Sequence, residues 1–215
     1  MSLKSRAVGW LALSCIAAIV VLNGNPQFTN ASQPARGIGS PVIALEVARN
    51  VDEVDDVLGE APSPDREAMR IKQYIDFFFI ASYSGLYIAL AWMLRTRLAA
   101  FAMICGLAAA VFDVIENFAI LRLLKVPLAY TTQAMVDAIR YPSLAKWALA
   151  FAASALFGAS FWRRQRSSLR TIAAFNFAAA AIGLYGIFDN AALLWAGIPL
   201  FAGLVTMVAV FWRFR

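Results

Sequence analysis

Long apolar runs recur along this chain, and short polar or basic segments separate them. The hydrocarbon core of a bilayer requires about 20 consecutive apolar residues in helical form. Each run is long enough, or nearly so, which predicts an all-α, polytopic membrane helix bundle. The expected spans are residues 7–22, 73–94, 98–124, 143–162, 171–196 and 199–212, with a turn at Gly197-Ile198-Pro199 before the last.

Residues 23–72 interrupt the apolar runs and form the longest polar segment. Within it, Ser40 is a suitable N-cap, Pro41 suits the first helical position and Gly59 suits a C-terminal stop. The pattern predicts a short amphipathic helix over residues 41–58, on the outer membrane face or at the mouth of the bundle, with a partner-binding helix as the alternative. Its apolar stripe is Ile43, Val47, Val51, Val54 and Leu58.

Helix signals also mark the start of the next element and of the chain. Ser63-Pro64-Asp65 begins a helix that we expect to run without a break into the second span. The run at 7–22 follows Lys4 and Arg6, a pattern shared by signal peptides and first spans. We interpret it as a retained span, with a cleaved signal peptide as the alternative.

Basic residues gather at one set of span ends. Six spans place both chain termini on the same side, and that side carries no acidic residue. By the positive-inside rule it is cytoplasmic, which makes 23–72 extracytoplasmic. We expect the chain in the bacterial cytoplasmic (inner) membrane. The basic residues on this side are Lys4, Arg6, Arg95, Arg97, Arg163, Arg164, Arg166, Arg170, Arg213 and Arg215.

The composition agrees with a membrane protein and removes several functional classes. Hydrophobic residues make up 61% of the chain, charged residues 15%, and the mean hydropathy is +0.68. The net charge of +6 comes from the span ends, so a nucleic-acid partner is not predicted. Histidine is absent, and Cys15 and Cys105 each lie inside an apolar run. No metal site, disulfide or cofactor is therefore expected. Most tryptophans, Trp147 among them, look like interface anchors at span ends.

Carboxylates inside the apolar runs are the candidate chemistry. Asp113, Glu116 and Asn117 follow the i, i+3, i+4 rule and share one helix face. An ionised carboxylate in a span costs at least ~2.5–3.5 kcal/mol, so it faces a partner or water. We expect Lys146 to lie close to this face or to Asp189. With four carboxylates present, at least one is protonated, hydrated or bound to a cation. The full candidate set for ligand or cation binding is Asp76, Asp113, Glu116, Asn117, Lys146, Asp189 and Asn190; no catalytic residue is identified.

Two helix hairpins resemble each other. Gly106-Leu107 followed by Phe112-Asp113 is echoed by Gly183-Leu184 followed by Phe188-Asp189. Aligning the preceding spans on their final tryptophans places Asp76 opposite Lys146. The pattern predicts two tandem hairpins related by an axis along the membrane normal.

Three short motifs together support a resemblance. They are Ala44-Leu45-Glu46-Val47-Ala48-Arg49, the stretch 76–83, and the helix with Asp113-x-x-Glu116-Asn117. In these the chain resembles a scattered group of uncharacterised bacterial membrane proteins. The resemblance implies a bacterial inner membrane protein and no particular activity.

Three functions remain open. The first is an outward-facing intramembrane polar site that binds a proton, a cation or a polar head group. The second is a non-catalytic accessory or structural subunit of a larger membrane complex, which contacts other subunits through small-residue helix faces or the 41–58 helix. The third is a membrane enzyme acting on a lipid or isoprenoid, for which no nucleophile–base pair is present. A purely structural ion-pair network explains the same residues without any ligand.

Overall fold

Six long helices dominate the part of the chain that the computed structural model describes, which is residues 3–29, 37–164 and 166–213. Within these ranges the chain forms helices and no strands. Each long helix has the length and apolar composition needed to cross a membrane. This confirms the predicted membrane helix bundle. The six are α1 (Leu3–Asn23), α4 (Pro64–Leu94), α5 (Arg97–Leu123), α6 (Gln133–Trp162), α7 (Ser167–Gly186) and α8 (Ala192–Arg213).

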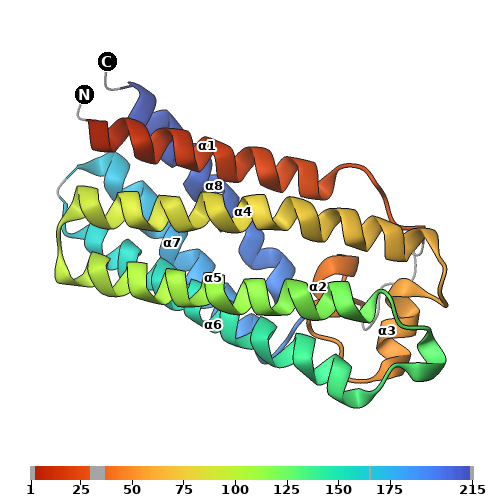
Figure 1. Ribbon diagram of the computed structural model, residues 1–215. Coiled ribbons are helices and arrows are strands. Elements are labelled where there is room, and N and C mark those ends of the chain that lie inside the picture. Colours follow the sequence, from red (N-terminus) through yellow and green to blue (C-terminus); the bar gives the residue numbers. More distant parts are fainter. Residues whose placement is uncertain (1–2, 30–36, 165, 214–215) are drawn as a thin grey trace.

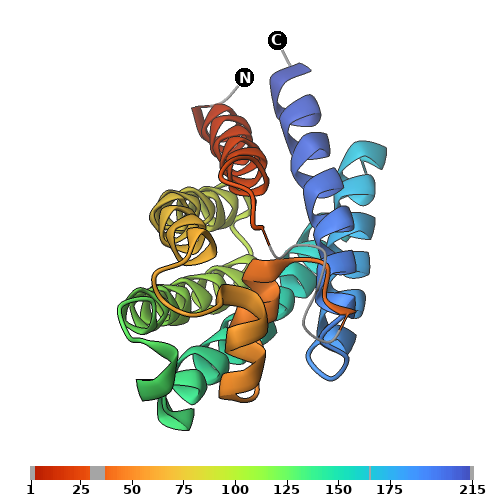
Figure 2. The same ribbon diagram turned by 90° about the vertical axis from the view of Figure 1, so that its right-hand side faces the viewer.

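The long helices form a closed ring. Each packs against the next along the chain, from α1 to α4 and on to α8, and α8 packs against α1. The ring is visible in the end-on view of Figure 2. Consecutive helices are antiparallel, so both termini lie at one end, which we call the terminal end (Figure 1). The pairs α4–α5 and α6–α7 are the hairpins that the tandem hypothesis requires, and symmetry between them stays a prediction.

Two short helices lie across the other end of the ring. They are α2 (Pro41–Glu46) and α3 (Val51–Leu58), and we call residues 41–58 the plug. Figures 1 and 2 show the plug at the end opposite to the termini, which we call the plug end. A short 3₁₀ helix, η2 (Leu128–Tyr130), lies in the connection between α5 and α6.

The prediction of one helix over 41–58 is wrong, because the chain starts a new helix at Asn50. The Asn50 Oδ1 atom accepts the backbone N–H of Glu53 at 2.9 Å, and Glu53 Oε2 accepts the backbone N–H of Arg49 at 2.9 Å. These reciprocal bonds satisfy donors at the start of α3. The predicted ends are correct, since Ser40 accepts the Ile43 N–H and Gly59 ends α3 at φ 62°.

The boundaries of α4 and α6 show where helices extend beyond the apolar runs. Ser63 caps α4 by accepting the Arg66 N–H at 3.1 Å, and the helix continues unbroken to Leu94, as predicted. Helix α6 begins at Gln133 instead of residue 143 and continues through Pro142. The polar stretch 133–142 is therefore the first part of a long helix.

The last turn is not where Gly197-Ile198-Pro199 predicts it. Helix α7 ends at Gly186, and α8 begins at Ala192 and contains Pro199. Asn190 Nδ2 donates to the carbonyls of Gly186 and Ile187, both at 3.2 Å. A Cβ on Gly186 would lie 2.8 Å from the backbone nitrogen of Leu193, so this close approach of two chain segments requires glycine. The spans predicted at 171–196 and 199–212 are corrected accordingly.

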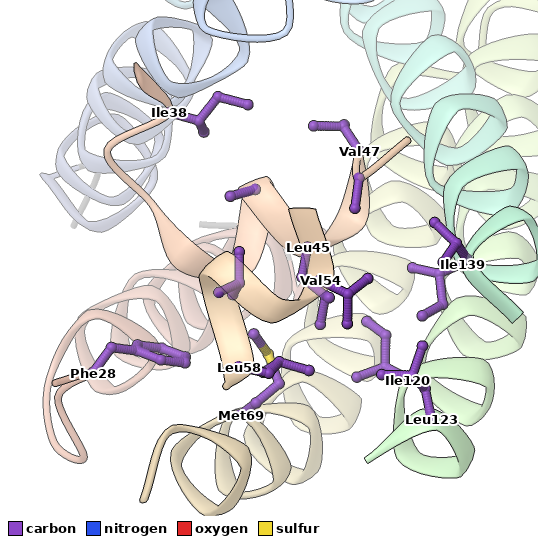
Figure 3. Close-up of a cluster of buried hydrophobic side chains, with 14 of the residues drawn as sticks. Phe28, Ile38, Leu45, Val47, Val54, Leu58, Met69, Ile120, Leu123 and Ile139 are labelled. Atoms are coloured by element: carbon purple, nitrogen blue, oxygen red, sulfur yellow. The ribbon is translucent and has the colours of Figure 1, made fainter. Parts of the chain in front are cut away.

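Buried apolar side chains form two cores, one toward each end of the ring. The plug-side core packs Leu45, Val54 and Leu58 of the plug against α4, α5 and α6 (Figure 3). The terminal-side core contains Val8, Leu90, Ala99, Phe157, Ile172 and Phe211, one from each long helix. The plug is therefore part of the bundle's interior and does not merely lie on a surface.

Candidate functional site

Lys146 lies at the centre of a buried group of acidic side chains. Its Nζ atom is 2.7 Å from Glu116 Oε2, 2.9 Å from Asp113 Oδ1 and 3.1 Å from Glu46 Oε1. The lysine side chain is 9% exposed and Glu116 is fully buried. The predicted proximity of Lys146 to the Asp113–Glu116 face is therefore present in the structure. Lys146 donates hydrogen bonds to Asp113 and Glu46, and its contact with Glu116 is an ion pair.

Helix α5 positions its polar residues through simple helical spacing. Asp113, Glu116 and Asn117 are all buried on the face that packs against α4 and α6. About two turns before Asp113 on the same helix, Gly106 lies against Tyr87 of α4, where a Cβ would be only 2.1 Å from the ring. The small residue allows α4 and α5 to approach closely, and this brings the polar groups of the two helices within reach of each other.

Helix α4 contributes a carboxylate and a phenol. Tyr83 donates its hydroxyl to Asp113 Oδ2 at 2.9 Å, so both oxygens of Asp113 have a donor. Asn117 Nδ2 donates to Asp76 Oδ2 at 2.8 Å. Asp76, predicted as a site residue, thus joins the group through Asn117. We call Glu46, Asp76, Tyr83, Asp113, Glu116, Asn117, Lys146 and Trp147 the Lys146 cluster.

Three members of the cluster, Tyr83, Glu46 and Trp147, were not predicted as site residues. Glu46 comes from α2, where the helical stripe of residues 41–58 assigns it to the polar face. Trp147, interpreted as an interface anchor, donates its indole N–H to Glu46 Oε2 at 2.9 Å and stacks on Phe151. One signal was available: a tryptophan beside a buried lysine supplies a second donor that needs an acceptor. The sequence gives no indication which acceptor that is.

Two predicted site residues lie apart from the cluster. Asp189 is exposed in the turn after α7, and the Tyr185 hydroxyl donates to it at 3.4 Å. Asn190 is buried and uses its amide to bond backbone carbonyls of the same turn. The early end of α7 explains both positions, because Asp189 and Asn190 lie in the turn after the helix and not on a helix face directed toward Lys146.

The cluster carries more negative charge than its lysine balances. Three carboxylates bind one ammonium, and their paired oxygens lie within about 6 Å of each other because each is about 3 Å from the same nitrogen. At that separation two ionised carboxylates repel by about 3 kcal/mol at an effective dielectric constant near 20. Within residues 3–29, 37–164 and 166–213, neither oxygen of Glu116 has a hydrogen-bond donor, although Oε2 is ion-paired with Lys146, and Gln73 Oε1 on α4 has no donor either. Buried acceptors without donors are rare and need an explanation.

The cluster lies closer to the plug end than to the terminal end. Asp113 is about 15 Å from the Leu123 end of α5 and about 24 Å from the Arg97 end, at ~1.5 Å of rise per residue. On the terminal side the interior is filled by the apolar terminal-side core. On the plug side, Glu46 itself connects the cluster to α2. The two sides of the cluster therefore differ in how near they are to a helix end.

Comparison with protein-family models, curated proteins and solved structures finds no match to this chain. The resemblance to uncharacterised bacterial membrane proteins stays a prediction. No activity comes to this chain from a relative.

Proposed function

We propose that this integral membrane protein binds a proton at the Lys146 cluster, with Glu116 as the group that holds it. The observation that carries the proposal is the Glu116 carboxyl group. It is fully buried, it shares Lys146 with Asp113 and Glu46, and its Oε1 atom has no donor among the described residues. A proton on Glu116 removes one of the repelling charges and turns an orphaned acceptor into a hydroxyl donor.

A proton fits this arrangement better than the other ligands that the sequence left open. The Lys146 ammonium already occupies the position between the carboxylates where a metal cation would bind. In the described part of the chain, no group of three or more Cys, Asp and Glu side chains is placed to hold a metal ion. A polar head group needs room among side chains that are buried, whereas a proton needs none.

The depth of the cluster supports proton exchange toward the plug end. The path from Asp113 to that end of α5 is the shorter one, and buried apolar side chains lie on both paths. With the termini assigned to the cytoplasm by the positive-inside rule, the plug end faces outward. The site then exchanges its proton with the extracytoplasmic side of a bacterial inner membrane.

Infrared spectroscopy of the purified protein tests the proposal. A protonated carboxyl group has a C=O stretching band that an ionised carboxylate lacks, and this band shifts in deuterated buffer. We expect such a band at neutral pH in the wild-type protein and its loss in Glu116→Gln. Glu67→Gln is the matched control, because Glu67 is exposed and ion-paired with Arg70 on the same turn. A wild-type spectrum without the band at neutral pH would disprove proton storage on Glu116.

A second candidate is a structural subunit of a larger membrane complex. It is favoured by the completeness of the other contacts, since both oxygens of Glu46 and both of Asp113 are paired. A permanently paired network fixes helix positions without any ligand. Gentle solubilisation of native membranes separates the candidates, because a subunit comes out with stoichiometric partners and a self-sufficient protein comes out alone.

A further inference from the structure

Lys146 and Trp147 hold a single carboxylate by both of its oxygens. Lys146 Nζ donates to Glu46 Oε1 at 3.1 Å, and Trp147 Nε1 donates to Glu46 Oε2 at 2.9 Å. The two donors are consecutive residues of α6, so their spacing is fixed by one helix. A pair of fixed donors that engages both oxygens is a geometry suited to recognising a carboxylate. The bound side chain is 8% exposed.

Glu46 differs from the other two carboxylates in how it reaches the lysine. Asp113 and Glu116 belong to α5, a helix of 27 residues in the ring. Glu46 is the last residue of α2, a helix of six residues that lies outside the ring's six long helices. The five residues before it, 41–45, are all apolar. In chemical terms, the group that Lys146 and Trp147 bind is a carboxylate attached to an apolar segment.

We propose that Lys146 and Trp147 form a binding site for a free monocarboxylate with an apolar body, and that Glu46 occupies this site in the structure. This inference rests on the proposed function, because a proton on Glu116 reduces the negative charge that any carboxylate meets there. Exchange of Glu46 for a free carboxylate replaces one anion by another, so the charge of the site stays the same. The ligand competes with the protein's own side chain.

The burial of the plug explains why the ligand needs an apolar body. Ala44 and Leu45 are each 1% exposed and Val47 is fully buried, so withdrawing α2 removes these side chains from the plug-side core. Burial of apolar surface is worth about 25 cal/mol per Å². A ligand that brings only a carboxylate cannot replace that lost burial, whereas an aliphatic chain can fill the same volume. A short anion such as acetate therefore binds only where Glu46 has been removed.

Thermal unfolding of the purified full-length protein tests the site in a variant that leaves it vacant. In Glu46→Ala, Trp147 has lost its acceptor, and Lys146 has lost one of its three carboxylates while keeping Asp113 and Glu116. We expect acetate and hexanoate to raise the Tm of this variant, while hexan-1-ol, with the same chain and no carboxylate, leaves it unchanged. The double variant Glu46→Ala with Lys146→Met is expected to show no response to either anion. A Glu46→Ala protein whose Tm does not respond to the anions overturns the proposal.

Amide hydrogen exchange of the wild type tests whether a free carboxylate displaces Glu46. Hexanoate is expected to accelerate exchange in residues 41–58, and hexan-1-ol and acetate are not. If hexanoate stabilises Glu46→Ala but leaves the wild-type plug protected, Glu46 is a permanent anchor and the proposal is wrong. Should Glu46→Ala fail to fold, Glu46→Gln retains the shape of the side chain with a weaker acceptor. Hexanoate is then expected to accelerate exchange of residues 41–58 at a lower concentration in Glu46→Gln than in the wild type. If both proteins need the same hexanoate concentration, the proposal is wrong.

The two proposals fail separately. If the wild-type protein lacks the infrared band but responds to hexanoate, the proton-storage proposal is wrong and the carboxylate site stands. A Glu116 band together with no hexanoate response leaves the proton site and removes the carboxylate site.

Discussion

The Nζ atom of Lys146 lies 2.7 Å from Glu116 Oε2, the shortest of the three ion pairs that this lysine makes. The pair joins α6 to α5, the two long helices with the most extensive mutual packing. The Glu116 side of the pair is fully buried. Lys146 stabilises Glu116 whenever that carboxyl group is ionised, whereas the charge of Lys146 is also stabilised by Asp113 and Glu46.

Removal of the lysine should be strongly destabilising. We expect Lys146→Met to lower the free energy of unfolding by ~3–5 kcal/mol, because it leaves buried carboxylates without their cation. Addition of Glu116→Gln should recover part of that loss. Denaturation in mixed micelles measures both variants, and Lys125→Met at an exposed position is the control. Strict additivity of the two substitutions would show that the pair is not coupled.

The close contact between Gly106 and Tyr87 should not tolerate a side chain. A Cβ at position 106 would lie 2.1 Å from Tyr87 Cδ2, so Gly106→Ala pushes the ring or the helix aside. Overpacking of this kind costs about 1–3 kcal/mol. Gly197→Ala is the matched control, since nothing lies within 4 Å of its added Cβ. Equal melting temperatures for the two variants would contradict the packing of α4 on α5.

The plug should be protected from hydrogen exchange and should lose that protection when a charge is placed in its core. Val54 is fully buried in the plug-side core. We expect Val54→Asp to expose amides of residues 41–58, because burying an unpaired carboxylate is one of the most destabilising changes known. Asp52→Asn on the exposed face of α3 should leave exchange unchanged. Rapid exchange over 41–58 in the wild type would refute the packed plug.

The two ends of the ring should lie on opposite sides of the membrane. In a background with Cys15→Ala and Cys105→Ala, a single cysteine at Asp52→Cys should react with an impermeant maleimide added from outside. Ser167→Cys should react only after the membrane is opened. Asp52 and Ser167 are both exposed in the structure. Reaction of both from the same side would rule out six crossings.

The sequence predicted what depends on local spacing. Asp113, Glu116 and Asn117 share a face because three and four residues separate them, whatever surrounds the helix. Apolar runs located the six long helices for the same reason. The start of the span in α6 was predicted too late, at residue 143, because Gln133 to Tyr141 is more polar than a typical span.

Contacts that depend on the path of the chain could not be predicted. Glu46 and Lys146 are separated by 100 positions, and nothing in the periodicity of α2 selects Lys146 as its partner. The turn before α8 was misplaced because Gly-Ile-Pro resembles a stop signal, although proline is tolerated inside membrane helices. The true turn depends on the close approach of Leu193 to Gly186, which only the folded chain shows.

The closed ring also implies an order of assembly during synthesis. Every member of the Lys146 cluster lies between residues 46 and 147, so its charges have found their partners once α6 has been made. The ring itself closes only when α8 packs on α1, where Trp212 meets Trp10 at a ring-centroid distance of 5.1 Å. Ribosomes release the chain from its N-terminus onward. The ion network thus has all its members in a nascent bundle of four long helices that is still open to lipid, and the final helix closes a ring around a site that is already complete.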